Sequence, residues 1–154
     1  MNKSLYSGIR AYEIVLSGFY QDLDMPHFIV EYSSNLDDEI KMQKLLGTLH
    51  DAALETGVFP LGGIRFRALR AEKYLIADGD PENAFVHMTL RMGHGRDLDT
   101  RKRAGEHIFE ALKSYFKPIQ AKRPLAISFE ITEAHEVLNF KENNIHTHIK
   151  NKQN

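Results

Sequence analysis

The sequence contains no cysteine, and its net charge is only −1. The absence of cysteine excludes a disulfide framework, a thiolate nucleophile and a zinc site built on sulfur, and it is compatible with a reducing cytoplasmic location. The balanced charge provides no electrostatic field for nucleic acid, so we expect no nucleic-acid partner. Any chemistry in this chain must therefore come from other side chains.

Long hydrophobic runs are also missing. The longest apolar stretch in the first 24 residues is IVLSGFY, whereas a membrane-spanning helix needs about 20 apolar residues. The region also lacks the cleavage site of a secretory signal. HExxH, Walker-type, GxSxG and complete GxGxxG motifs are absent as well. We therefore expect no membrane association, and the common catalytic motifs give no guidance.

The composition is that of a single globular domain, with 42% hydrophobic and 27% charged residues. The apolar pattern indicates strands at residues 27–32, 64–74, 84–92 and 124–132, and amphipathic helices at residues 33–57 and 97–118. Asn35 is the expected cap of the first helix, and Pro118 is the expected end of the second.

These elements form two successive strand–helix–strand units. Two βαβ units of similar length predict an α+β fold, with a four-stranded sheet and both helices packed on one face. Residues 1–25 are predicted to be an N-terminal extension, and residues 26–154 to be the folded domain.

The stretch DLDMPHF at residues 22–28 places a proline directly after an internal methionine. Proline has no N–H and is tolerated at the start of a strand, which explains Pro26 without any function. Alternatively, Met25 is the true initiator and is removed, so that Pro26 becomes the amino terminus with a free secondary amine. The residue pattern leaves both interpretations open.

Three arginines are candidates for binding an anion. Arg65 and Arg67 lie on one face of the strand at residues 64–74, where they either meet solvent or bind anions. Arg96 ends the sequence GHGR directly before the second helix. A helix N-terminus favours a carboxylate, and the arginine fork is well suited to bind one.

The histidines are better explained by structure than by chemistry. His146 and His148 have no third ligand at a suitable spacing, so a solvated or interface tail explains them better than a metal site does. His87 lies within an apolar strand and is more simply a hydrogen-bonded core histidine than a catalyst. We therefore predict no metal and no cofactor.

A terminal Pro26 and the three candidate arginines would form a site that needs neither a metal nor a cofactor. An α-amine has a pKa of about 7.7–8.0 and a prolyl amine starts higher, so a base near neutral pH needs a lowered pKa. Burial and nearby arginines both disfavour the charged amine. The same arginines would bind an anionic substrate and stabilise an oxyanion. An internal Pro26, by contrast, has an amide nitrogen without a basic lone pair.

Five stretches carry a resemblance to a known family, and they are spread over nearly the whole length from Pro26: PHFIVEY, TGVFPLGGIRFR, ADGDPENAFVHMTLRMGHGR, LAISFEI and LNFKENNIH. They resemble the 5-carboxymethyl-2-hydroxymuconate Δ-isomerases of the tautomerase superfamily. The resemblance implies a homotrimer of two-βαβ subunits and a cofactor-independent isomerase. It also implies a step in the meta-cleavage degradation of homoprotocatechuate, which bacteria form from 4-hydroxyphenylacetate.

The resemblance further implies roles for four residues. The family's amino-terminal catalytic proline corresponds to Pro26, and its substrate-binding arginines correspond to Arg65 and Arg96, with Arg67 as a secondary candidate. Pro26 would move a proton from the 2-hydroxyl group of a di- or tricarboxylate dienol to C5, giving the 2-oxo-3-ene isomer. The arginines would bind the carboxylates and the 2-oxygen.

The 24 residues before Met25 depart from the family pattern. Three explanations compete: a wrongly chosen upstream start, a precursor segment that is removed, or a translated extension that keeps Pro26 as an amide. We favour the first. In the third case the chain would be a dicarboxylate-binding or interaction protein without isomerase activity.

Overall fold

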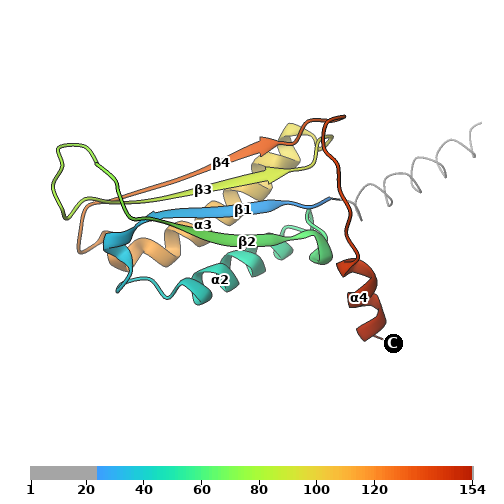
Figure 1. The fold of residues 1–154 in the computed structure, drawn as a ribbon, viewed down its shortest axis with the longest axis horizontal. Coiled ribbons are helices and arrows are strands. Elements are labelled where there is room, and N and C mark those ends of the chain that lie inside the picture. The colour runs from blue at the N-terminus through green and yellow to red at the C-terminus, as the bar shows by residue number, and fades with distance from the viewer. Residues whose placement is uncertain (1–23, 154) are drawn as a thin grey trace, which may run out of the picture.

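The structure is a computed structural model that describes residues 24–153. A mixed sheet contains the strands β1 (His27–Ser33), β2 (Arg65–Ala71), β3 (Ala84–Met92) and β4 (Leu125–Glu133). The spatial order is β2-β1-β3-β4; the two outer pairs are parallel, and β1 and β3 are antiparallel. Helices α2 (Met42–Glu55) and α3 (Leu98–Gln120) connect the parallel pairs and cover the same face of the sheet (Figure 1). The predicted α+β fold is confirmed.

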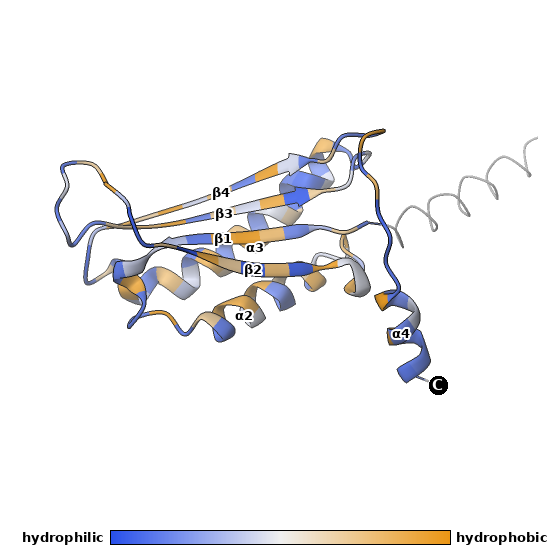
Figure 2. Cartoon of the chain, in the orientation of Figure 1, coloured by the Kyte–Doolittle hydropathy of each residue, from blue (hydrophilic) through white to orange (hydrophobic). Residues whose placement is uncertain are grey.

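The core lies between this face and the two helices. Phe28 and Val30 of β1 are fully buried, and the Phe28 ring stacks on Phe66 of β2 with a centroid distance of 4.2 Å. Ile108 and Leu112 of α3 are also fully buried. Hydrophobic positions gather where the helices meet the sheet, and hydrophilic ones on the outer side of α2 and α3 (Figure 2). Because strand side chains alternate, the neighbours of Phe28 and Val30 lie on the helix-free face.

The first helix begins later than predicted. Residues Ser34–Leu36 form a short 3-10 helix, η1, and α2 starts only at Met42. Asn35 does not cap α2. Its side-chain amide instead donates to the carbonyls of Pro81 and Asn83, at 3.0 and 2.8 Å, and so connects η1 to the loop before β3.

The second helix begins where expected but continues past its predicted end. The Asp97 side chain accepts a hydrogen bond from the N–H of Thr100, at 2.8 Å, and caps α3. Pro118 lies inside the last turn, and the helix ends at Gln120. A proline disturbs the turn before it, and the residues after it can remain helical.

A further helix, α4 (Ile145–Lys152), follows an extended segment after β4 and had no counterpart among the predicted elements. It packs against η2 (Leu61–Gly63), where a Cβ on Gly62 would overlap the ring of His146. Asn143 donates from its side chain to the carbonyl of Gly62, at 3.0 Å. The tail that carries His146 and His148 is therefore docked on the domain.

Two negative observations apply to residues 24–153. No helix there is long and apolar enough to cross a membrane. Nor do three or more His, Cys, Asp or Glu side chains come together there as a set that could hold a metal ion. The cytoplasmic location stays a prediction, and so does the division at residue 25, because residues 1–23 lie outside the described part of the chain.

Candidate active site

One edge of the sheet collects an end of every strand. β1 and β2 begin at this edge, and β3 and β4 end there, because the two parallel pairs run in opposite directions (Figure 1). The backbone connects the segments that meet: the N–H of Arg65 donates to the carbonyl of Pro26, at 3.0 Å, and the N–H of Ala134 donates to that of Met92, at 2.7 Å. The fold thus brings Pro26 close to the start of β2 and to the segments after β3 and β4.

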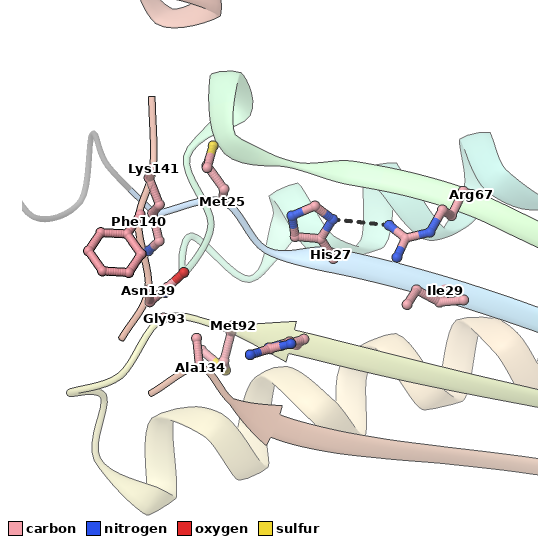
Figure 3. Close-up of a pocket in the computed structure, with 11 residues that line it drawn as sticks. Met25, His27, Ile29, Arg67, Met92, Gly93, Ala134, Asn139, Phe140 and Lys141 are labelled. Carbon is pink, nitrogen blue, oxygen red and sulfur yellow. Dashed lines mark hydrogen bonds between the residues drawn. The ribbon is translucent and has the colours of Figure 1, made fainter. Parts of the chain in front are cut away.

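An open pocket of about 320 Å³ lies at this edge on the helix-free face. Its wall includes His27 of β1 and Arg67 of β2, and the segment after β4 adds Phe140 and Lys141 (Figure 3). Arg91 of β3 also lines the pocket. Three of these side chains are permanent or near-permanent cations. The pocket is therefore suited to a small anion.

His27 is neutral within this cationic wall. Arg67 Nη1 lies 3.0 Å from His27 Nδ1 (Figure 3). A guanidinium can only donate, so Nδ1 accepts and the ring proton is on Nε2. Burial lowers the pKa of His27 from its ordinary value of 6.5, and the charges of Arg67, Arg65, Arg91 and Lys141 lower it further. The same charges act on any basic group placed beside His27.

Pro26 is buried between two residues that line the pocket, Met25 and His27. It does not line the pocket itself. In the chain as described, its nitrogen forms the peptide bond with Met25 and is an amide. The base expected at this position therefore exists only in a chain whose first residue is Pro26.

The predicted arginines have different environments. Arg67 lines the pocket, as described, whereas Arg65 does not. The Arg65 guanidinium turns back and donates to the carbonyls of Gly62 and Gly63 in η2. The backbone of Arg65 thus lies beside the start of β1, and its positive charge acts there. Its side chain does not enter the pocket.

Arg96 lies beside the pocket in a well-defined setting. Its Nη2 donates to the carbonyl of Val58, at 3.0 Å, and its guanidinium lies 5.9 Å from the ring centre of Phe59. The same Nη2 lies 2.8 Å from Oδ2 of Asp24, an ion pair outside hydrogen-bond geometry. Arg96 therefore already holds a carboxylate, which belongs to the chain itself.

Asp24 is the residue that sequence reasoning missed altogether. It is only 3% exposed, although it precedes the family-like part of the chain. Its Oδ1 accepts from the N–H of Gly93, at 2.9 Å, and lies 3.9 Å from Nζ of Lys141. No sequence signal indicated these contacts, because the partners lie far along the chain, in the loop after β3 and in the segment after β4.

Two cationic residues that line the pocket, Arg91 and Lys141, were also not predicted. Arg91 lies opposite His27 in the β1–β3 register, so strand alternation could have placed both beside Arg67 once the pairing was known. Lys141 belongs to the stretch LNFKENNIH, whose role was not assigned. His87 is hydrogen-bonded as expected, to Ser128 at 2.7 Å, but it lies on the helix-free face rather than in the core.

The match to a known protein family begins at Pro26. A family model described as 5-carboxymethyl-2-hydroxymuconate isomerase matches residues 26–149. The 5-carboxymethyl-2-hydroxymuconate Delta-isomerase of Escherichia coli is 46% identical to this chain over 126 residues, which is 82% of this chain and 100% of that protein.

Two crystal structures agree with this match. A 5-carboxymethyl-2-hydroxymuconate isomerase from Deinococcus radiodurans R1 is 39% identical and superposes with a TM-score of 0.77, over 82% of this chain and 96% of that one. A second 5-carboxymethyl-2-hydroxymuconate delta-isomerase is 34% identical with a TM-score of 0.78, over 85% and 96% of the two chains. The chain therefore belongs to the 5-carboxymethyl-2-hydroxymuconate isomerase family and is an isomerase.

Proposed function

We propose that this chain, when it begins at Pro26, isomerises 5-carboxymethyl-2-hydroxymuconate to the 2-oxo-3-ene form without a cofactor. The step would belong to the meta-cleavage degradation of homoprotocatechuate. Membership of the isomerase family supports the reaction class. The observation that carries the proposal is the group of cations, Arg67, Arg91 and Lys141, around the start of β1.

Pro26 is proposed as the group that moves the proton. As the first residue it would have a basic secondary amine, and its buried position would disfavour the protonated form. The cations that lower the pKa of the adjacent His27 would act in the same direction on this amine. A lowered pKa would let Pro26 take the proton of the 2-hydroxyl group near neutral pH and deliver it to C5.

The arginines are proposed to bind the substrate. Arg67 is placed to meet a carboxylate or the 2-oxygen in the pocket, where negative charge develops as the hydroxyl proton leaves. Arg96 would take a carboxylate, as its contact with Asp24 supports. Arg65 would contribute its charge, and would reach the substrate only after leaving the carbonyls of η2.

The test of Pro26 uses a chain that starts at Met25, from which the initiator is removed. Pro26→Ala in this chain should lose most of kcat while still binding the substrate, because a primary alanyl amine replaces the secondary amine. Pro81→Ala, in the exposed loop before β3, is the matched control and should keep its activity. Unchanged turnover in Pro26→Ala would remove Pro26 from the mechanism.

A second candidate function applies if residues 1–25 are retained. The amide nitrogen of Pro26 and the Asp24 contact with Arg96 both favour a chain that does not isomerise its ligand. Such a chain would bind dicarboxylates through its remaining cations, and a dicarboxylate would raise its melting temperature without turnover. The intact mass of the protein expressed from its own upstream DNA distinguishes the two cases.

We also propose that the protein is a homotrimer. The family resemblance is the basis, and the segment after β4 is consistent with it. Val137, Leu138 and Phe140 are 71%, 67% and 88% exposed in the single chain. Large apolar side chains gathered on one segment are typical of a surface that a neighbouring subunit covers.

A further inference from the structure

A carboxylate is buried beside the pocket, and it has three partners. The side chain of Asp24 is 4% exposed, and those of Arg96 and Lys141 are 17% and 19% exposed. Oδ1 accepts from the N–H of Gly93, and Oδ2 pairs with Arg96 at 2.8 Å. A backbone donor and two cations thus surround one anionic group at the end of β3.

Two glycines let the segment before Pro26 come this close. A Cβ on Gly93 would lie 2.6 Å from Oδ1 of Asp24, and a Cβ on Gly63 would overlap the carbonyl oxygen of Asp24. Only glycine leaves room for these contacts. The cradle therefore fits both the side chain and the backbone of Asp24.

We propose that the Gly93 N–H, Arg96 and Lys141 form a subsite for one carboxylate of the substrate, and that Asp24 occupies this subsite whenever the residues before Pro26 are present. The proposal rests on the isomerase function proposed above and deepens it. It gives Lys141, in the stretch LNFKENNIH, the role of a substrate-binding residue. It also makes Asp24 an internal competitor, separate from the blocking of the Pro26 amine.

Asp24 favours this position because its carboxylate is the anionic partner of several buried groups. Without its carboxylate, a buried N–H and two largely buried cations would lose their anionic partner, which is costly. An external carboxylate would restore these interactions, and charge-assisted hydrogen bonds are the strong ones. While Asp24 is present it is tethered at the site, so its effective concentration exceeds that of a free ligand.

The location is suitable for a substrate group. Two residues of extended chain span at most about 7 Å, so the subsite lies within the length of a small dienol from the Pro26 nitrogen. Lys141 also lines the pocket that contains Arg67. A substrate could therefore place one carboxylate in the subsite and the rest of its chain beside Pro26 and Arg67.

The test measures binding, because any chain that retains Met25 lacks the amine and cannot report through activity. The probe is cis,cis-muconate, a dicarboxylate diene without the 2-hydroxyl group, titrated calorimetrically into the full chain. Asp24→Ala is expected to bind it about tenfold or more tightly than the wild type. Asp51→Ala, which removes an exposed carboxylate on α2, is the matched control and should match the wild type.

Lys141 is tested in the same background. The double variant Asp24→Ala, Lys141→Ala should lose most of the gained affinity, whereas Asp24→Ala with Lys44→Ala, an exposed lysine on α2, should keep it. If Asp24→Ala does not fold, Asp24→Asn replaces it. Its amide oxygen still accepts from Gly93 but carries no charge, so muconate should bind it more tightly than the wild type.

Two results would overturn the proposal. Equal affinities of the wild type and both Asp24 variants would show that Asp24 does not compete, and an unchanged affinity on loss of Lys141 would remove that residue from the subsite. A different result would show that the proposed isomerase function is wrong. A chain that begins at Met25 would then bind muconate but would not isomerise the dienol.

Discussion

Burial, and then the neighbouring positive charges, lower the pKa of His27. It lies between Arg67, which donates to its Nδ1, and the positive charges of Arg65, Arg91 and Lys141. A protonated ring would lose the hydrogen bond and add a further positive charge. At the scale of the residue, the pocket is thus arranged to keep a histidine neutral and to attract an anion.

His27 makes the stability of the protein depend on pH in a defined direction. Its pKa in the folded chain lies below 6.5, so below that pH the unfolded chain binds more protons. Its contribution to the free energy of unfolding is complete above pH 6.5 and is lost as the pH falls through the lowered pKa. Urea unfolding measures this effect. Between about pH 7.5 and about pH 5.5, the free energy of unfolding should decrease less for His27→Gln than for the wild type.

The control for this measurement is His148→Gln, on the exposed side of α4. It should show the pH dependence of the wild type. A His27→Gln variant with an undiminished pH dependence would mean that other groups account for it.

Arg67 is expected to contribute more to the reaction than other arginines of its strand. In the chain that starts at Met25, Arg67→Ala should lower kcat/KM by about tenfold or more, because a charge-assisted contact with the substrate is lost. Arg70→Ala is the matched control, since Arg70 lies on the same strand but pairs with Asp37 at 2.7 Å. Steady-state kinetics of the two variants decide the point. Wild-type kinetics in Arg67→Ala would exclude it from the site.

At the scale of elements, local pattern predicted most of the structure. The four strands and the start of α3 follow from apolar periodicity. The cap of α3 is also local, because Asp97 needs only the N–H of Thr100 three residues later. The start of α2 could not be predicted in this way. Asn35 has the residue type of a cap, but its partners Pro81 and Asn83 are more than 40 residues away in the chain.

The end of β3 offers a test of how the segment before Pro26 is held. Gly93→Ala should lower the melting temperature of the full chain, because its Cβ would lie 2.6 Å from Oδ1 of Asp24. The same substitution should lower the melting temperature much less in a chain that starts at Met25. Without Asp24, the nearest atom to the added Cβ is Lys141 Nζ, at 3.6 Å. Thermal unfolding of the four proteins provides the comparison. Equal losses in both backgrounds would contradict the contact with Asp24.

At the scale of the whole molecule, the single chain leaves one face of the sheet without helices. The pocket lies on this face, and the segment after β4, which carries the exposed apolar side chains of Val137, Leu138 and Phe140, lines it. A subunit interface that covers this segment would also complete the wall of the pocket. Assembly and activity are therefore expected to be coupled.

Sedimentation tests this expectation directly. The proposed trimer should have three times the mass of the 17.7 kDa chain. Phe140→Ser should weaken the assembly, because Phe140 is 88% exposed in the single chain and a polar side chain would reduce the apolar area available for burial. Leu75→Ser, on the distant loop before β3 and 85% exposed, is the matched control. A stable monomer at working concentrations would contradict the proposal.

The sequence by itself determined the order of the elements, the α+β fold and the family from Pro26 onward, because periodicity and short motifs are local properties of the chain. Only the tertiary structure decided where the charges go. Arg65 turns to η2, Arg96 meets Val58 and Asp24, and Lys141 joins them from the segment after β4. Each of these side chains forms hydrogen bonds or ion pairs with groups that are distant in the sequence or in another element, and only folding brings those groups together.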